Sequence, residues 1–156
     1  MNNMQGKFPS TRLRRNRMKE FSRRLVAENT LSVNDLILPL FVCEGNKVDD
    51  PINSMPGVSR YSIDKLLSEV EKAVKFNIPA IAIFPQIESG LKNSEGSLAV
   101  DENNLVCRSI KSIKKDFPNI GIVCDVALDP FTDHGHDGLV INDKIDNDKT
   151  LEVLEQ

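Results

Sequence analysis

The sequence predicts an α/β protein, namely the amino-terminal portion of a parallel (β/α)8 barrel preceded by an extended basic arm. Three observations lead to this fold class. Short apolar runs recur about every 40 residues, an amphipathic helical pattern separates each pair of runs, and a long polar loop follows each of the first two runs. Barrel enzymes place their active sites in long loops that follow parallel strands.

The first 17 residues form the predicted arm, and residues 18–156 form the predicted incomplete barrel. Residues 1–24 hold eight Lys and Arg against one Glu, so this segment is basic. The remainder of the chain is acidic, and the two parts together give the net charge of −3. Such a segment can bind nucleic acid, dock on an acidic neighbouring subunit, or present a solvated basic face. Phe8 and Phe21 are its only aromatic residues, which is few for stacking on single-stranded nucleic acid.

Parallel strands are expected in three apolar runs, at residues 36–42, 80–84 and 120–126. Runs that are apolar on both faces are typical of strands covered by helices on one side and by packed core on the other. Two amphipathic helices are expected between them. The first is capped by Ser62 and ends before Pro79, and the second begins near Leu105 and ends before Pro118.

A third helix is expected to begin at Asn147-Asp148, and the sequence then stops at Gln156, within two turns. Three strands cannot close a barrel, which needs eight strands and roughly 250 residues. The sequence therefore predicts a fragment that holds the first three strand–helix units and is truncated in the third helix.

The three cysteines, Cys43, Cys107 and Cys124, show neither disulfide nor metal spacing, which favours reduced thiols in the cytoplasm. The apolar runs are too short to cross a bilayer, and the amino terminus lacks the apolar core of a signal peptide. We therefore expect a cytoplasmic protein without a membrane partner. A basic, acid-poor organellar transit peptide is the alternative for the amino terminus.

The segment from residue 125 to residue 138 holds both histidines of the protein and four aspartates. If the third strand continues into it, Asp125, Ala127 and Asp129 share one side, while Val126 and Leu128 face the helices. A carboxylate placed on the inner side of a barrel is costly unless it is paired, coordinated or used.

Gly135 and Gly138 allow tight turns that would bring His134, His136 and Asp137 back over the same strand end. Three interpretations compete for this segment. It is a solvated loop of turn-forming residues, a divalent metal site, or a carboxylate cluster that binds a cationic substrate and moves protons. Composition alone does not separate the last two.

An ordered series of motifs resembles the porphobilinogen synthase (5-aminolevulinate dehydratase) family. The motifs are FPSTRLRRNR at 8–17, FSRRL at 21–25, LPLFV at 38–42, SMPGV at 54–58, IPAIAIFP at 78–85 and the acidic segment at 125–138. The resemblance implies the condensation of two 5-aminolevulinate molecules to porphobilinogen with loss of water. It also implies a homo-octamer whose amino-terminal arm embraces a neighbouring subunit, which favours docking over nucleic-acid binding for Arg12, Arg14, Arg15 and Arg17.

Zinc-dependent members of that family hold the metal with three cysteines, and the matching positions here are Ala127, Asp129 and Asp137. The sequence therefore resembles the aspartate-rich branch, in which Mg²⁺ or a monovalent cation often stimulates the enzyme. Catalytic zinc is not expected, because hard oxygen ligands replace thiolates. The resemblance implies Asp129 and Asp137 as active-site carboxylates and candidate metal ligands, Asp125 as their neighbour, and His134 as an orienting residue.

The family works through two lysines that form Schiff bases, and the resemblance places both beyond Gln156. Lys144 and Lys149 do not stand in the matching context, so residues 1–156 alone are expected to be inactive. The alternative is an inactive half-barrel or a subunit-interaction module. A small phospho-acceptor domain fits poorly, because that class needs an acidic pair after its first strand and only Glu44 is found there.

Overall fold

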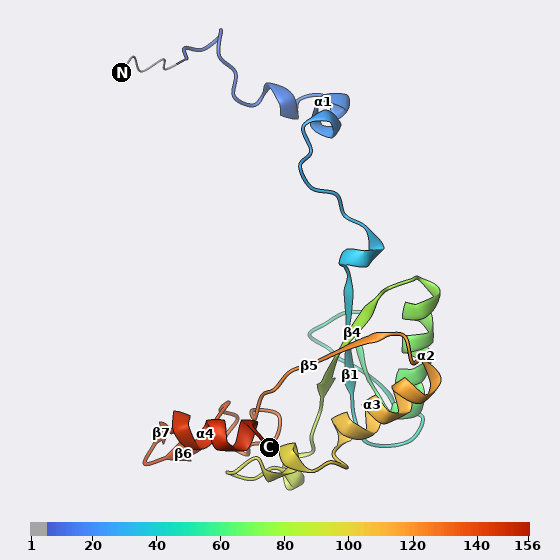
Figure 1. The fold of residues 1–156 in the computed structure, drawn as a ribbon, viewed down its shortest axis with the longest axis vertical. Helices are drawn as coiled ribbons and strands as arrows, with labels where there is room; N and C mark the ends of the chain where they lie inside the picture. The colour runs from blue at the N-terminus through green and yellow to red at the C-terminus, as the bar shows by residue number, and fades with distance from the viewer. Residues whose placement is uncertain (1–5) are drawn as a thin grey trace. The chain divides into compact units, whose positions relative to one another are not determined.

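The computed structural model describes residues 6–156, and the chain divides into two units, Met1–Ser32 and Val33–Gln156 (Figure 1). The first unit holds a short 3₁₀ turn, Arg15–Arg17, and the helix α1 (Glu20–Leu25). None of its described residues is buried. The boundary between the two units lies at residue 32, and the division of the chain into an arm of residues 1–17 and a barrel from residue 18 stays a prediction.

The second unit is built on a five-stranded sheet in the order β2-β3-β1-β4-β5. The parallel neighbours β1 (Ile37–Val42), β4 (Ala80–Pro85) and β5 (Gly121–Cys124) occupy the three predicted runs. The predicted α/β organisation with a parallel sheet is therefore confirmed. Two short strands, β2 (Asp49–Pro51) and β3 (Ser59–Tyr61), lie within the segment expected to be a loop after β1.

The helices α2 (Ile63–Lys75) and α3 (Leu105–Asp116) form where the apolar periodicity predicted them, and they lie on the same side of the sheet (Figure 1). Alternate residues of the strands meet the apolar stripes of these helices and form the core. Its most buried members include Leu40, Val42, Ile81, Ile83, Leu66, Val70 and Ile113. Burying a side chain of this size contributes roughly 1.5–3 kcal/mol, so this layer is the main source of stability.

A polar residue stands at the N-cap of each helix. Ser62 is the N-cap of α2, as predicted, but its side chain makes no capping hydrogen bond. Its hydroxyl instead accepts from Val48 N–H (2.9 Å) and donates to Asp64 (2.7 Å). The Ser62 hydroxyl and the Lys47 N–H hold the pKa of Asp64 below its usual value, because both donate to the carboxylate. Asn104 caps α3 by accepting from Cys107 N–H (2.9 Å).

The other face of the sheet is apolar, and no helix covers it within residues 33–156. In the parallel register Phe41 lies beside Phe84 and Ala82 beside Val123, on the side opposite the buried residues. The two phenylalanine rings have centroids 5.7 Å apart. Val123 is 45% exposed and Ile37 is 54% exposed. Parallel sheets are normally covered on both faces, whereas this sheet has one face covered by α2 and α3 and one exposed apolar face, which we call the open face.

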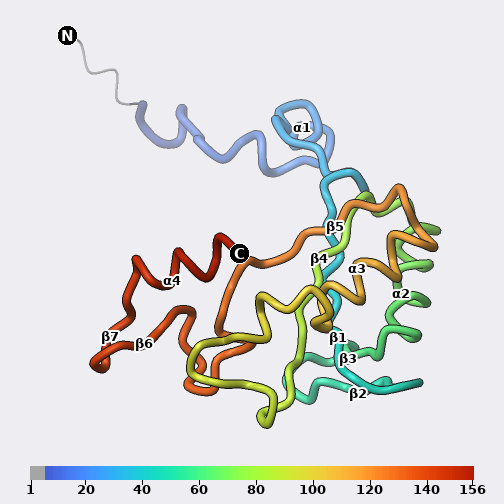
Figure 2. The backbone as a smooth tube through the Cα atoms, turned by 60° about the horizontal axis from the view of Figure 1, so that its bottom comes forward, coloured from blue at the N-terminus to red at the C-terminus, as the bar shows by residue number. Residues whose placement is uncertain are grey.

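Beyond β5 the chain forms a hairpin and a last helix, which Figure 2 shows in red. The strands β6 (Val140–Ile141) and β7 (Lys144–Ile145) pair antiparallel across Asn142 and Asp143, which both have positive φ. The helix α4 (Asn147–Leu154) is capped by the Asp146 carboxylate, one residue before the predicted cap. Among residues 6–156, no helix has the length and apolar composition needed to span a membrane.

Replacing Ile83 by Ala should lower the free energy of unfolding by about 2–5 kcal/mol, because the 1% exposed side chain leaves a cavity under α2 and α3. Val123→Ala, on the open face, should cost less than about 1 kcal/mol, because its side chain keeps much of its contact with water. Urea denaturation of both variants checks this difference. Equal losses would contradict the assignment of the covered face.

Candidate functional site

A cavity of about 520 Å³ opens at the carboxyl ends of β4 and β5. Its wall is formed by the ends of these strands, the start of α3, the segment after β5 and the end of α4. Four acidic residues line it: Asp101, Glu102, Asp125 and Asp129. Sites for small molecules have volumes of roughly 300–1,000 Å³ with a few convergent polar groups, which this cavity matches.

The structure brings Asp125 and Asp129 to this cavity, but not by the strand alternation predicted from the sequence. Strand β5 ends at Cys124, so the side-chain alternation of a paired strand does not extend to the residues that follow. Leu128 is buried as expected, whereas Val126 is 70% exposed, and its expected contact with the helices is wrong. After Leu128 the chain turns, and Phe131 N–H and Thr132 N–H both donate to the Leu128 carbonyl oxygen, at 2.8 and 3.0 Å.

Asp137 returns to the base of this turn. Its Oδ1 accepts a hydrogen bond from Leu128 N–H at 2.7 Å, immediately before Asp129 in the chain. Gly135 and Gly138 have φ values of 71° and 151°, so both take the turn conformations predicted for them. Asp137 does not line the cavity, and one of its oxygens is used to hold the turn.

His134 joins the acidic segment to the loop after β4. Its Nε2 lies 3.3 Å from the carbonyl oxygen of Ser94, and its Nδ1 accepts from His136 N–H at 3.1 Å. A carbonyl oxygen can only accept, so the Nε2 contact is a hydrogen bond in the tautomer in which Nε2 donates to Ser94 and Nδ1 accepts from His136 N–H. Thr132 strengthens the same turn by donating its hydroxyl to the His136 carbonyl oxygen (2.9 Å).

The described residues do not gather a metal site. Among residues 6–156, no group of three or more His, Cys, Asp or Glu side chains is arranged to hold an ion. The oxygens of Asp129 and Asp137 are of the type that Mg²⁺ prefers, but they lack the further ligands that such an ion needs. The donor groups of this part of the chain therefore do not by themselves fit a bound Mg²⁺.

Sequence reasoning missed several residues of the cavity wall. Asp101 is the last residue of the loop predicted after β4, and Glu102 follows it. Their position before the cap of α3 was the available signal. Cys107 and Cys124 also line the cavity. The pKa of the Cys124 thiol is raised, first by burial and then by the proximity of Cys107, so this thiol stays protonated at neutral pH.

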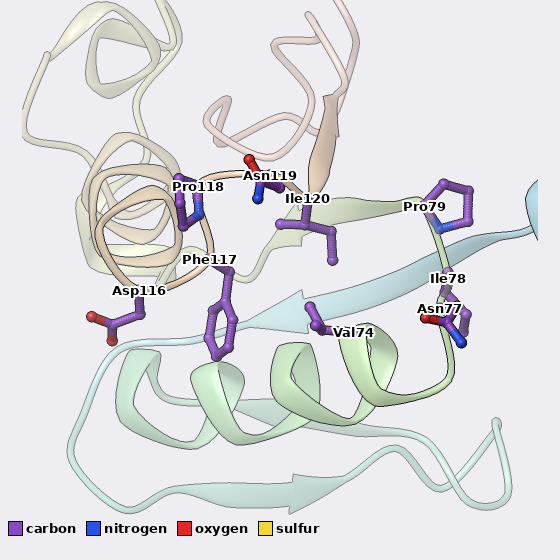
Figure 3. A pocket seen from close by; sticks show the side chains of 9 residues that line it. All are labelled: Val74, Asn77, Ile78, Pro79, Asp116, Phe117, Pro118, Asn119 and Ile120. Carbon is purple, nitrogen blue, oxygen red and sulfur yellow. The ribbon is translucent and has the colours of Figure 1, made fainter.

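A second hollow of about 370 Å³ lies at the amino ends of β4 and β5, the opposite end of the sheet (Figure 3). Most of its lining is apolar, with Phe117, Pro118 and Ile120 on one side and Val74 and Ile78 on the other. Of the nine lining residues only Asp116 ionises. A single carboxylate provides no acid–base pair, so the cavity at the carboxyl ends is the candidate site.

The arm arginines, Arg12, Arg14, Arg15 and Arg17, are all exposed within the first unit. The Arg12 guanidinium lies 5.6 Å from the centroid of the Phe8 ring, and Arg17 offers its carbonyl oxygen to Arg23 (2.9 Å). These contacts are local to the first unit and leave its basic surface open to solvent.

An acidic cavity at the carboxyl ends of parallel strands, formed by the loops that follow them, is the arrangement of an α/β enzyme site. The sequence matches the family described as delta-aminolevulinic acid dehydratase over residues 10–156, and the chain belongs to this family.

Relatives from distant organisms agree with this assignment. The chain is 54% identical to the delta-aminolevulinic acid dehydratase of Bradyrhizobium diazoefficiens over 92% of its length and 43% identical to that of Chlamydia pneumoniae over 93%. It spans 40% and 44% of those two proteins. A crystal structure of the Toxoplasma gondii enzyme in complex with the reaction product porphobilinogen is 40% identical, with a TM-score of 0.85 over 92% of this chain and 41% of that one.

Replacing Asp137 by Ala should free the Leu128 amide, because it removes the acceptor 2.7 Å away. We expect hydrogen exchange at Leu128 to accelerate about fivefold, which corresponds to roughly 1 kcal/mol for this partly buried hydrogen bond. Asp133→Ala is the matched control, since among the described residues no partner hydrogen-bonds its carboxylate. Unchanged exchange in the Asp137 variant would show that the bond does not hold the turn.

Proposed function

We propose that the natural protein containing this chain condenses two molecules of 5-aminolevulinate to porphobilinogen with loss of water, in tetrapyrrole synthesis. The observation that supports this most strongly is the fold match to an enzyme that holds porphobilinogen, combined with an acidic cavity at the strand ends. In this proposal the chain supplies the first part of a (β/α)8 barrel, with residues 1–17 as an arm.

The open face of the sheet supports the barrel. Ile37, Phe41, Phe84 and Val123 form an apolar surface with no helix against it among the described residues. In a closed barrel such inward side chains are buried in layers contributed by alternate strands. Further parallel strands would therefore cover this face and leave the acidic cavity at the mouth of the barrel.

The cavity can recognise the substrate by charge. 5-Aminolevulinate carries an ammonium group, and the carboxylates of Asp125 and Asp129 provide negative charge on the cavity wall. A carboxylate at this point can accept a proton from the ammonium, and the free amine can then attack a carbonyl carbon to form the carbon–nitrogen bond. Asp137 and His134 hold the turn that presents Asp129.

The Schiff-base lysines of the proposed mechanism come from parts of the protein outside this chain. Lys144 belongs to the β6–β7 hairpin, and neither Lys144 nor Lys149 lines the cavity. Stimulation by Mg²⁺ or a monovalent cation, a cytoplasmic location, and the lack of nucleic-acid and membrane partners stay predictions from the sequence.

The proposal includes a homo-oligomer, an octamer by family resemblance, in which the basic arm of one subunit docks on the acidic body of another. The exposed guanidinium groups of the arm and its exposed Phe8 and Leu13 side chains support this role. A basic and partly apolar segment gains both charge pairing and apolar burial on such a surface.

Asp129→Asn in the natural full-length protein should lower kcat for porphobilinogen formation about 100-fold or more, the usual range for the loss of a proton-transferring group. Asp133→Asn is the control in the same segment and should retain activity. The assay measures porphobilinogen colorimetrically after incubation with 5-aminolevulinate, and residues 1–156 alone should give none. A wild-type protein that makes no porphobilinogen would favour the interaction module, and full activity of the Asp129 variant would remove its assigned role.

A further inference from the structure

The loops that follow β4 and β5 are joined at Asn93. Asn93 N–H donates to the Phe131 carbonyl oxygen (3.3 Å), and Asp133 N–H donates to the Asn93 carbonyl oxygen (3.2 Å). Asn93 and Thr132 thereby form an isolated parallel bridge outside the sheet. Figure 2 shows the two segments side by side, the first in yellow-green and the second in orange.

The Asn93 side chain closes its own loop into a compact turn. Its Oδ1 accepts from Glu95 N–H (3.2 Å) and Ser97 N–H (3.1 Å), and its Nδ2 donates to the Ser97 hydroxyl (2.6 Å). Gly96, at φ 60°, sits against the acidic segment, so that a Cβ placed there would lie 3.4 Å from the Thr132 side chain. The turn therefore packs directly on the segment that it bridges.

Hydrogen bonds connect the Asn93–Thr132 bridge to the turn that carries Asp129 at the acidic cavity. Phe131 accepts from Asn93, and both Phe131 and Thr132 donate to the Leu128 carbonyl oxygen. Asp129 lies inside this turn, so its direction depends on where the bridge holds residues 131–133. The backbone of Asn93 makes the bridge, and its side chain sets the conformation of that backbone.

We infer that Asn93 is a positioning residue for the acidic cavity, which acts on Asp129 through the Leu128–Thr132 turn. This inference rests on the proposed function, because its effect is read in porphobilinogen formation. The Asn93 side chain does not line the cavity, so it has no direct role in binding or proton transfer.

The test compares three variants of the natural full-length protein with the wild type. Asn93→Ala should lower kcat about 10-fold or more while KM changes less than about threefold, because a misplaced carboxylate slows the reaction more than it weakens binding. Asn93→Asp keeps an acceptor for both amides and should recover kcat to within about threefold of wild type. Ser94→Ala, in the same turn, keeps its carbonyl contact and should match the wild type.

A purely structural role would lower the melting temperature of Asn93→Ala and leave kcat per folded enzyme, measured on soluble protein, unchanged; that result overturns the inference. If Asn93→Ala does not fold, Ser97→Ala tests the inference instead. This variant removes only the 2.6 Å hydrogen bond from Asn93 Nδ2 to the Ser97 hydroxyl and should lower kcat about two- to fivefold. Wild-type kcat in Ser97→Ala would then overturn it. If the wild-type protein makes no porphobilinogen, the proposed function is wrong. If the wild type is active and Asn93→Ala has the same kcat, only this inference is wrong.

Discussion

The structure depends on one constraint, which is that a parallel sheet must bury both of its faces. The β1–β4–β5 register places Leu40 and Ile83 on one side, where α2 and α3 cover them, and Phe41 and Phe84 on the other, where the described residues provide no covering helix. Burial of the first face orders the domain. The exposure of apolar side chains on the second face to water is unfavourable, and further strands would bury that face in the proposed barrel.

The candidate site follows from the same sheet. Parallel strands deliver their carboxyl ends to one edge, so the loops after β4 and β5 meet there and enclose the acidic cavity. Hydrogen bonds within these loops then set the positions of the carboxylates. Asp137 holds the start of the turn at Leu128, and Asn93 holds its end. Chemistry assigned to Asp129 therefore depends on residues that do not touch the substrate.

The sequence predicted the parts of the fold that depend on apolar periodicity, because burial of α2, α3 and the three long strands requires it. It did not predict β2 and β3, which pair through backbone groups of polar segments such as Asp49–Pro51. For the site, strand alternation placed Asp125 and Asp129 on one side, and the family resemblance named Asp129 and Asp137 with Asp125 as their neighbour. The exposure of Val126 was missed because strand periodicity was extended past Cys124. The role of Asn93 arises from long-range backbone contacts, which leave no local pattern.

Hydrogen exchange of the peptide spanning residues 121–128 is the clearest test of a barrel that continues beyond this chain, because β5 is the edge of the described sheet. We expect the amides of β5 that do not bond to β4 to exchange fast in residues 1–156 alone and to be strongly protected in the natural full-length protein, since a following parallel strand would pair with the free edge of β5. Equal exchange of this peptide in the two proteins would contradict the continued barrel, because it would mean that no further strand closes the sheet at this edge.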